Sequence, residues 1–250
     1  YSHGRAAGMW QFIPSTGKSY GMKQTWWYDG RRDVIASTEG AIKYLQRLHK
    51  MFDGDWLHAL AAYNSGEGRV MRSIRKNKRR GKPTDFWSLD LPRETRAYVP
   101  KLLALADILA NKESYAFDWP TINNQAVIEI VDVGSQIDLA VAAKKAGLTT
   151  KELHSLNPGY NRWATDPHGP HRLVVPRRLA LEFIAALATT EPQDRLNWVR
   201  HKVKSGESLS LIANKYNTTI DVMQNINGMK NNVIYTSDFL LVPIALKSMD

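Results

Sequence analysis

Apolar positions in the first half of the chain recur at the spacing of helices. In residues 34–52 they repeat close to every 3.6 residues, which predicts a helix of about five turns. Residues 56–63 predict a second helix, and Pro92 marks the start of a further one. Its expected buried face consists of Tyr98, Leu102, Leu105 and Leu109. The pattern predicts that residues 1–118 form an all-helical half, with loops at residues 1–7 and at the basic run of residues 69–82.

After residue 119 the pattern changes to that of short strands. Residues 127–133 alternate and are rich in β-branched side chains, as strands are. Two copies of a strand–helix–helix–strand order follow, one ending at Pro176 and one ending at Pro243. The sequence therefore predicts an α+β multidomain fold, with a helical domain at 1–118 and two small βααβ modules at 119–195 and 196–250.

Residues 61–70, which read AAYNSGEGRV, carry an apolar run into a turn with two glycines. Gly66 and Gly68 permit positive φ and close approach of a ligand, while Tyr63 offers a flat face and a hydroxyl. These features suit the wall of a polar groove. The alternative is a helix that ends at a glycine cap, with another helix starting at Arg69.

Residues 8–17, which read GMWQFIPSTG, place an amide between two aromatic rings before a Pro-Ser-Thr-Gly turn. Sugars offer hydroxyl and acetamido groups to an amide, and C–H faces to aromatic rings. Gln11 is therefore a candidate sugar ligand. Trp10 and Phe12 are equally well explained as core residues.

These two stretches, followed by ETRAYV at residues 94–99, resemble the goose-lysozyme-like catalytic domain of lytic transglycosylases. Segments 28–33 and 50–56 are similar to one branch of that family, membrane-bound lytic murein transglycosylase D. The resemblance implies a lyase that cleaves the MurNAc-β-1,4-GlcNAc bond of peptidoglycan without water and leaves 1,6-anhydroMurNAc ends during cell-wall turnover. It implies glycan strands as partner, no cofactor, and a place in the bacterial periplasm or envelope, with any membrane anchor outside this sequence.

In this family one glutamate acts as acid and then as base, and the motif spacing implies that it precedes Tyr1. The resemblance assigns Tyr63 to support that glutamate. It assigns contacts with the sugar or the groove wall to Gln11, Asn64, Ser15, Thr16, Glu94 and Tyr98. Glu67 and Glu94 are expected to orient substrate or neighbours rather than to donate the proton. A non-catalytic peptidoglycan-binding protein is the alternative function, because the general acid is expected outside the sequence.

The second βααβ copy resembles a LysM module, the short sugar-binding repeat of cell-wall proteins. The residues that carry this resemblance and its sugar-binding role are Gly206, Glu207, Ser208, Leu209 and Asn227. The first copy departs from the pattern: it has Ser135 and Gln136 where a LysM module has an acid and a hydroxyl residue, and a long insertion at residues 158–170. A scaffold that no longer binds sugar is one interpretation of this copy, and a module that still binds sugar is the other.

Charge and composition limit the remaining possibilities. The net charge is +10, and residues 69–82 carry eight basic side chains with no acid between them. Such a run suits an anionic wall or membrane surface, a nucleic acid, or solvent alone. No recognised nucleic-acid motif accompanies it. The absence of cysteine excludes disulfides and thiolate ligands, and His168 and His171 lack the acidic partners of a metal site.

Overall fold

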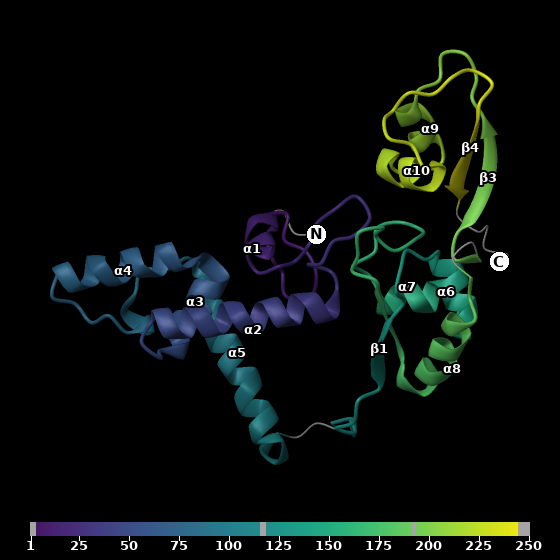
Figure 1. The fold of residues 1–250 in the computed structure, drawn as a ribbon. Helices are drawn as coiled ribbons and strands as arrows, with labels where there is room; N and C mark the ends of the chain where they lie inside the picture. The colour runs from purple at the N-terminus through teal and green to yellow at the C-terminus, as the bar shows by residue number, and fades with distance from the viewer. Residues whose placement is uncertain (1–3, 116–118, 192–193, 245–250) are drawn as a thin grey trace. The chain divides into compact units, whose positions relative to one another are not determined.

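The structure is a computed structural model that describes residues 4–115, 119–191 and 194–244. Residue contacts divide the chain into two compact units. One unit contains residues 15–21 and 35–124, and the other contains residues 1–14, 22–34 and 125–250. Figure 1 shows the elements of both. No helix in the described ranges is long and apolar enough to cross a membrane.

The first unit is helical, as predicted. Its elements are α1 (Pro14–Ser19, of which Pro14 belongs to the other unit), α2 (Val34–Met51, likewise from Ile35), α3 (Trp56–Ser65), α4 (Glu67–Arg79), η1 (Phe86–Ser88), α5 (Arg93–Ala110) and η2 (Lys112–Ser114). The Asp55 side chain caps α3 by accepting a hydrogen bond from the His58 N–H at 3.0 Å. Helix α4 begins directly after Gly66, which has a φ of 88° and ends α3. The helix–cap–helix interpretation of this stretch is therefore confirmed, with α4 starting two residues before Arg69.

The predicted buried face of α5 is wrong over most of its length. Thr95 and Val99 are the buried residues of this helix. Leu105 and Leu109 are 58% and 59% exposed, and Leu102 is also exposed. The N-terminal part of α5 packs against α3, and the apolar stripe continues past that contact. Helical spacing identifies a stripe, but it does not specify how far a neighbouring element covers it.

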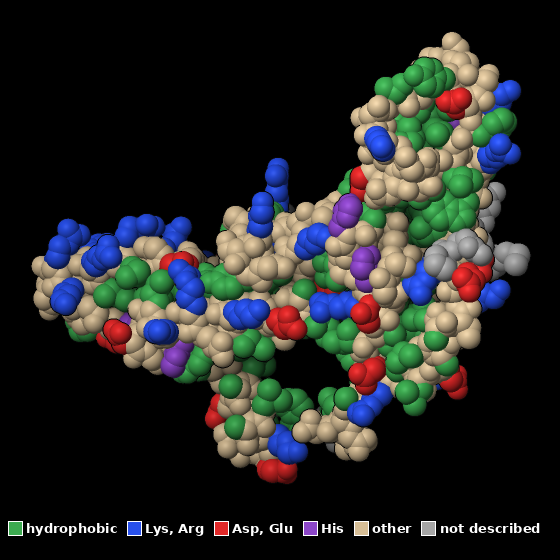
Figure 2. All heavy atoms as spheres, viewed as in Figure 1, with side chains coloured by type: hydrophobic (Ala, Val, Ile, Leu, Met, Phe, Trp, Pro, Cys, Tyr) green, Lys and Arg blue, Asp and Glu red, His purple; other side chains and the backbone are tan. Residues whose placement is uncertain are grey.

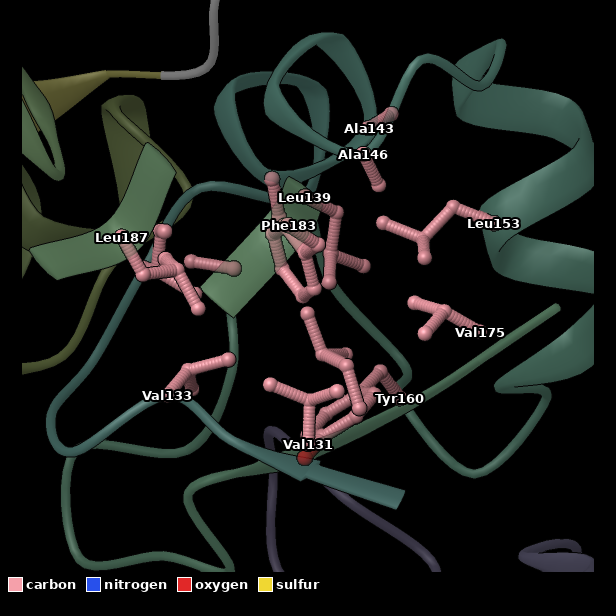
Figure 3. Close-up of a cluster of buried hydrophobic side chains, with 14 of the residues drawn as sticks. Val131, Val133, Leu139, Ala143, Ala146, Leu153, Tyr160, Val175, Phe183 and Leu187 are labelled. Carbon is pink, nitrogen blue, oxygen red and sulfur yellow. The ribbon is translucent and has the colours of Figure 1, made fainter. Parts of the chain in front are cut away.

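The first βααβ copy, module 1, is formed by β1 (Ile128–Asp132), α6 (Leu139–Lys145), α7 (Thr150–Leu156), β2 (Arg172–Pro176) and the following α8 (Arg177–Ala188). Strands β1 and β2 are antiparallel and pair Ile128 with Pro176. Their apolar faces meet the helices in a core of fully buried side chains. Figure 3 shows these side chains, among them Val131, Leu153, Val175 and Phe183, gathered in one cluster.

The second copy, module 2, is formed by β3 (Asn197–Lys202), α9 (Leu209–Lys215), α10 (Ile220–Asn227) and β4 (Phe239–Ile244). Strands β3 and β4 are antiparallel and pair Asn197 with Ile244. This module has a core of its own, made by Val203, Leu209, Ile212, Ala213, Met223, Leu240 and Val242. The βααβ order predicted for both copies is confirmed.

The helix caps correct the alignment of the two copies at the turn after the first strand. Asp138 caps α6 and Ser208 caps α9, so these two residues correspond. Ile137, which is fully buried, then stands where module 2 has Glu207. The prediction that Ser135 and Gln136 occupy the acid and hydroxyl positions is therefore wrong by two residues, because the sequence alone does not locate the cap.

Candidate functional site

A polar groove of about 510 Å³ lies in the helical unit, between α1, α2 and the start of α4. It is lined by Ser15, Thr16, Ser19, Tyr20, Tyr44, Arg47 and Glu67. The sequence identified Ser15 and Thr16 as groove residues, and both lie on its wall. It did not identify Tyr20, Tyr44 or Arg47. Tyr44 and Arg47 lie three residues apart on α2. From the sequence alone the tyrosine is explained by packing and the arginine by exposure to solvent.

Glu67 is held in the groove as an anion. Its carboxylate accepts hydrogen bonds from Arg47 at 2.9 Å and from the Tyr44 hydroxyl at 3.1 Å. Burial alone raises the pKa of Glu67, but its own backbone N–H and these two side chains together hold the pKa below its usual range. Burial and the neighbouring carboxylate raise the pKa of Tyr44. At neutral pH this cluster therefore holds a carboxylate and a phenol, and Glu67 has no proton to donate.

Three tyrosine rings follow one another from the groove toward α5. The ring centroids of Tyr20 and Tyr44 are 4.9 Å apart, and those of Tyr44 and Tyr63 are 5.4 Å apart. Tyr63 is half-buried, and burial together with the nearby Tyr98 raises its pKa. Its hydroxyl therefore stays protonated at neutral pH and can donate a hydrogen bond to a carboxylate or to a sugar oxygen.

Asn64 and Glu94, both predicted site residues, are brought together by α3 and α5. The Asn64 side-chain amide donates to the Glu94 carboxylate at 3.2 Å, and its oxygen accepts from the Thr95 hydroxyl at 2.7 Å. Thr95 is buried and Glu94 is exposed. The threonine therefore fixes which way the amide points. Tyr98 follows one turn later on α5 and is half-buried.

Gln11 belongs to the other unit and lies in a tight turn. It is exposed, has a φ of 51°, and its side chain donates to the Gly8 carbonyl at 2.7 Å. Gly8 is required there, because a Cβ would lie 1.7 Å from the Arg31 carbonyl oxygen. The buried ion pair of Arg31 with Asp29, at 2.7 Å, holds this backbone. Phe12 is buried, which favours the core interpretation for that ring.

In module 2 the predicted sugar-binding residues have structural partners. Glu207 accepts from the Lys204 N–H at 2.8 Å and faces His201 at 2.8 Å, while Ser208 caps α9. Gly206 has a φ of 82° and Leu209 is buried in the core. These contacts shape the turn, and the role of the turn in sugar binding stays a prediction.

Asn227 connects the end of α10 to β4. Its amide donates to the Met223 and Leu241 carbonyls and accepts from the Leu241 N–H, each at 2.8 Å. Asn157 makes the same three contacts in module 1, with Leu153 and Val174. In both modules the amide therefore joins the second helix to the second strand, and its contact with sugar stays a prediction.

No group of three or more His, Asp or Glu side chains within the described ranges is placed to hold a metal ion. His168 instead faces Asp221 at 3.1 Å, and burial lowers the pKa of His171.

The prediction of a loop at the basic run is wrong, because most of that run lies in helix α4 and its basic side chains line the exposed sides of the helix. Val70, Ser73 and Asn77 are its buried residues. A second hollow, of about 640 Å³, is lined by Arg72, Arg75, Lys76, Lys78 and Arg79. Figure 2 shows Lys and Arg side chains gathered along this helix.

Comparison with known proteins assigns three parts of the chain to families. Residues 1–86 match the transglycosylase SLT domain family, and residues 201–243 match the LysM domain family. Residues 127–192 match a family described as "Lytic transglycosylase MltD, LysM-like domain". The chain carries a transglycosylase SLT domain and two LysM-type domains.

Individual relatives support the same assignment. Membrane-bound lytic murein transglycosylase D from Escherichia coli K12 and from the O6:H1 strain CFT073 is 44% identical to the chain over 251 residues. That alignment covers 96% of the chain and 56% of each relative, so the chain spans little more than half their length. Peptidoglycan transglycosylase gp16 of Escherichia phage T7 is 39% identical over 103 residues, which is 40% of the chain and 7% of the relative.

Proposed function

We propose that the chain is part of a lytic murein transglycosylase that cleaves the MurNAc-β-1,4-GlcNAc bond and leaves 1,6-anhydroMurNAc ends. The observation that carries the proposal is the tyrosine-rich polar groove in a chain with an SLT domain. Tyr63 packs against Tyr44 of the groove wall, and the next residue, Asn64, is hydrogen-bonded to Glu94. Such a groove offers protonated hydroxyls and a fixed amide to the hydroxyl and acetamido groups of a glycan strand.

The reaction needs a proton delivered to the leaving oxygen and no external nucleophile, because the sugar's own 6-hydroxyl attacks C1. Glu67 does not supply this proton, since its carboxylate is held as an anion by Arg47 and Tyr44. We assign the general acid to a glutamate that precedes Tyr1, as the motif spacing of the family implies. Tyr63 then supports that carboxyl, and Asn64, set by Thr95, contacts the substrate.

The proposal places the protein in the bacterial periplasm or envelope, with module 2 as a glycan-binding domain. The basic side of α4 faces an anionic wall or membrane surface in this account. Lys76 pairs with Asp90 at 2.9 Å, while the neighbouring Arg72, Arg75 and Arg79 extend the positive charge. Binding to sacculi and to DNA can be compared at low and high salt. Binding to sacculi that remains at high salt, together with loss of DNA binding, would support glycan rather than nucleic acid as the ligand.

The test is digestion of purified sacculi, with mass spectrometry of the products. A chain extended upstream through the expected glutamate should release 1,6-anhydromuropeptides. The 250-residue chain should bind sacculi but react about 10² to 10⁴ times more slowly, the usual contribution of positioned acid catalysis. Circular dichroism establishes that both are folded before rates are compared.

The matched variant is Glu67→Gln in the extended chain. Because Glu67 is an anion that anchors Arg47 and Tyr44, the variant should keep product formation within about tenfold of the parent. Loss of all product in a folded Glu67→Gln chain would make Glu67 the acid. Equal rates for the short and extended chains would place the acid within residues 1–250, and sacculus binding without product from either would favour the non-catalytic alternative.

A further inference from the structure

The insertion of module 1, residues 158–170, closes onto the turn that leads into α6. The Thr165 N–H donates to the Ile137 carbonyl at 3.0 Å, and the Leu139 N–H donates to the Trp163 carbonyl at 2.8 Å. The Thr165 hydroxyl in turn accepts from the Ile137 N–H at 3.0 Å. Thr165 and Ile137 are fully buried. The backbone of the turn is therefore already paired, by a piece of the same module.

The corresponding place in module 2 is open. Its turn, residues 204–208, and the loop after α10, residues 229–236, have no hydrogen bond joining them within the described range 194–244. Gly206 is exposed, and Tyr235 in the loop is 70% exposed. The resemblance to LysM modules places the sugar groove beside this turn and the end of α10.

The backbone of the same insertion binds a segment from the first part of the chain, residues 23–33. The Asn161 N–H donates to the Trp27 carbonyl at 2.7 Å, and the Asp29 N–H donates to the Gly159 carbonyl at 2.8 Å. Residues 23–33 and the insertion belong to one compact unit. The two segments pair as short antiparallel strands do, which uses up backbone groups that a ligand would need.

Two tyrosines seal this contact. Tyr28 and Tyr160 are each 2% exposed, with ring centroids 5.2 Å apart. Gly159 allows the close approach, because a Cβ there would lie 2.9 Å from a Tyr28 ring carbon. Residues 23–33 and the insertion therefore form a closely packed interface.

Buried polar groups specify how the two segments fit. The Thr25 hydroxyl donates to Asp166 at 2.6 Å, and Asp166 is 1% exposed. Lys23 donates to the His168 carbonyl at 2.8 Å, and Arg32 donates to the Asn161 side chain at 2.6 Å. A buried carboxylate is costly unless it is hydrogen-bonded, so these partners define one arrangement.

We infer that module 1 binds residues 23–33 of its own chain in place of a glycan, and that its insertion fills the groove that stays open in module 2. Of the two modules, module 2 alone then serves as a sugar-binding domain. The part of the inference that concerns module 2 rests on the proposed function, whereas the part that concerns module 1 rests on its own contacts.

The first test is an NMR titration of the ¹⁵N-labelled 250-residue chain with N-acetylglucosamine oligomers. Saturable shifts are expected at residues 204–209 and 228–237. Residues 134–139 and 158–170 are expected to shift no more than the exposed side of α8. Saturable shifts at residues 134–139 of the size seen in module 2 would overturn the inference.

The second test is hydrogen exchange at four amides that donate across these contacts: Asp29, Leu139, Asn161 and Thr165. Thr25→Val removes the donor to buried Asp166 and should speed exchange at Asp29 and Asn161 about tenfold or more. Thr25→Ser should restore protection. Thr189→Val is the matched control, because Thr189 is exposed at the end of α8.

The two tests separate the two claims. Silence at both modules in the titration, with protected amides at Asp29 and Asn161, would reject glycan binding by module 2 and leave the intramolecular contact standing. Fast exchange at Asp29 and Asn161 in the parent chain, or equal effects of Thr25→Val and Thr189→Val, would show that residues 23–33 are not bound by module 1.

Discussion

Modules 1 and 2 share a fold but differ in what lies against it. Each is locked by an asparagine at the end of its second helix, Asn157 or Asn227, and each caps its first helix from the preceding turn. In module 1 that turn is paired with the insertion, and in module 2 it faces solvent. The repeated scaffold therefore predicts the asparagine contacts and the helix caps, while function depends on the loops that differ.

The difference begins at one position of the turn. Module 1 has Ile137, a buried side chain that joins the core. Module 2 has Glu207, which is held by His201 and the Lys204 backbone at the edge of the turn. An apolar residue favours covering the turn, whereas an acid with a histidine partner keeps it polar and accessible.

Expressing each module alone should give the largest difference in stability between them. Module 2 expressed alone, residues 196–246, should unfold cooperatively and bind chito-oligosaccharides, because its own core stays intact when excision exposes Leu196 and Val222, which pack into the module 1 cluster. Module 1 expressed alone, residues 125–191, lacks residues 23–33 and exposes Tyr160, which costs about 2 kcal/mol for that ring. Its thermal unfolding, followed by circular dichroism, should have a low midpoint or be uncooperative.

Restoring the missing partner is the control for excision. A peptide of residues 23–33 added to isolated module 1 should raise its midpoint. If isolated module 1 melts as sharply as module 2 and ignores the peptide, the contact with residues 23–33 is not part of its fold.

The matched variants Asn157→Ala and Asn227→Ala should destabilise module 1 more than module 2. Each removes three hydrogen bonds to backbone, but Asn157 is buried and Asn227 is half-buried. We expect a loss in free energy of unfolding of about 3 kcal/mol for Asn157→Ala and about 1.5 kcal/mol for Asn227→Ala, measured with urea. Loss of sugar binding by Asn227→Ala with unchanged stability would instead make Asn227 a sugar contact.

A smaller difference should appear at acid pH. Hydrogen bonds from the Lys204 backbone and from His201 lower the pKa of Glu207 below its ordinary value near 4.5. A carboxyl whose folded pKa is depressed stabilises the fold above its unfolded pKa, and that stabilisation is lost as pH falls through the folded pKa. Stability of module 2 should therefore decrease as pH falls from about 5.

Glu207→Gln isolates this contribution. The variant should be less stable than the parent at neutral pH and should lose the part of the acid dependence that belongs to Glu207. Urea unfolding of isolated module 2 at a series of pH values measures both. Identical pH profiles for the parent and the variant would show that Glu207 contributes nothing to the fold.

Much of this architecture could be predicted from periodicity. The spacing at residues 34–52 predicts a helix, and α2 spans Val34–Met51; the β-branched alternation at 127–133 contains β1. Local pattern failed where tertiary contact decides. It marked Leu105 and Leu109 as buried although no neighbour covers them among the described residues, and it placed the module 1 turn two residues out of register.

The groove shows the same limit. Ser15 and Thr16 are predictable because they belong to a recognisable motif, whereas Asn64 and Glu94 belong to two separate motifs that the fold brings together. Tyr44 and Arg47 carry no motif, since a tyrosine and an arginine on a helix are ordinary. Their importance comes from Glu67, which lies 23 positions from Tyr44 and 20 from Arg47 and contacts them only in the folded chain.

The central claim is that module 2 binds glycan and module 1 does not. It is tested by measuring binding of the 250-residue chain to purified sacculi, with the same substitution made in each turn. Ser205 and Ser135 are corresponding, exposed residues, so Ser205→Trp and Ser135→Trp add the same bulk to an open turn and to a filled one. We predict that Ser205→Trp raises the dissociation constant about tenfold or more, and that Ser135→Trp leaves it within about twofold. Equal weakening by both substitutions, in chains that fold as the parent does, would contradict the account.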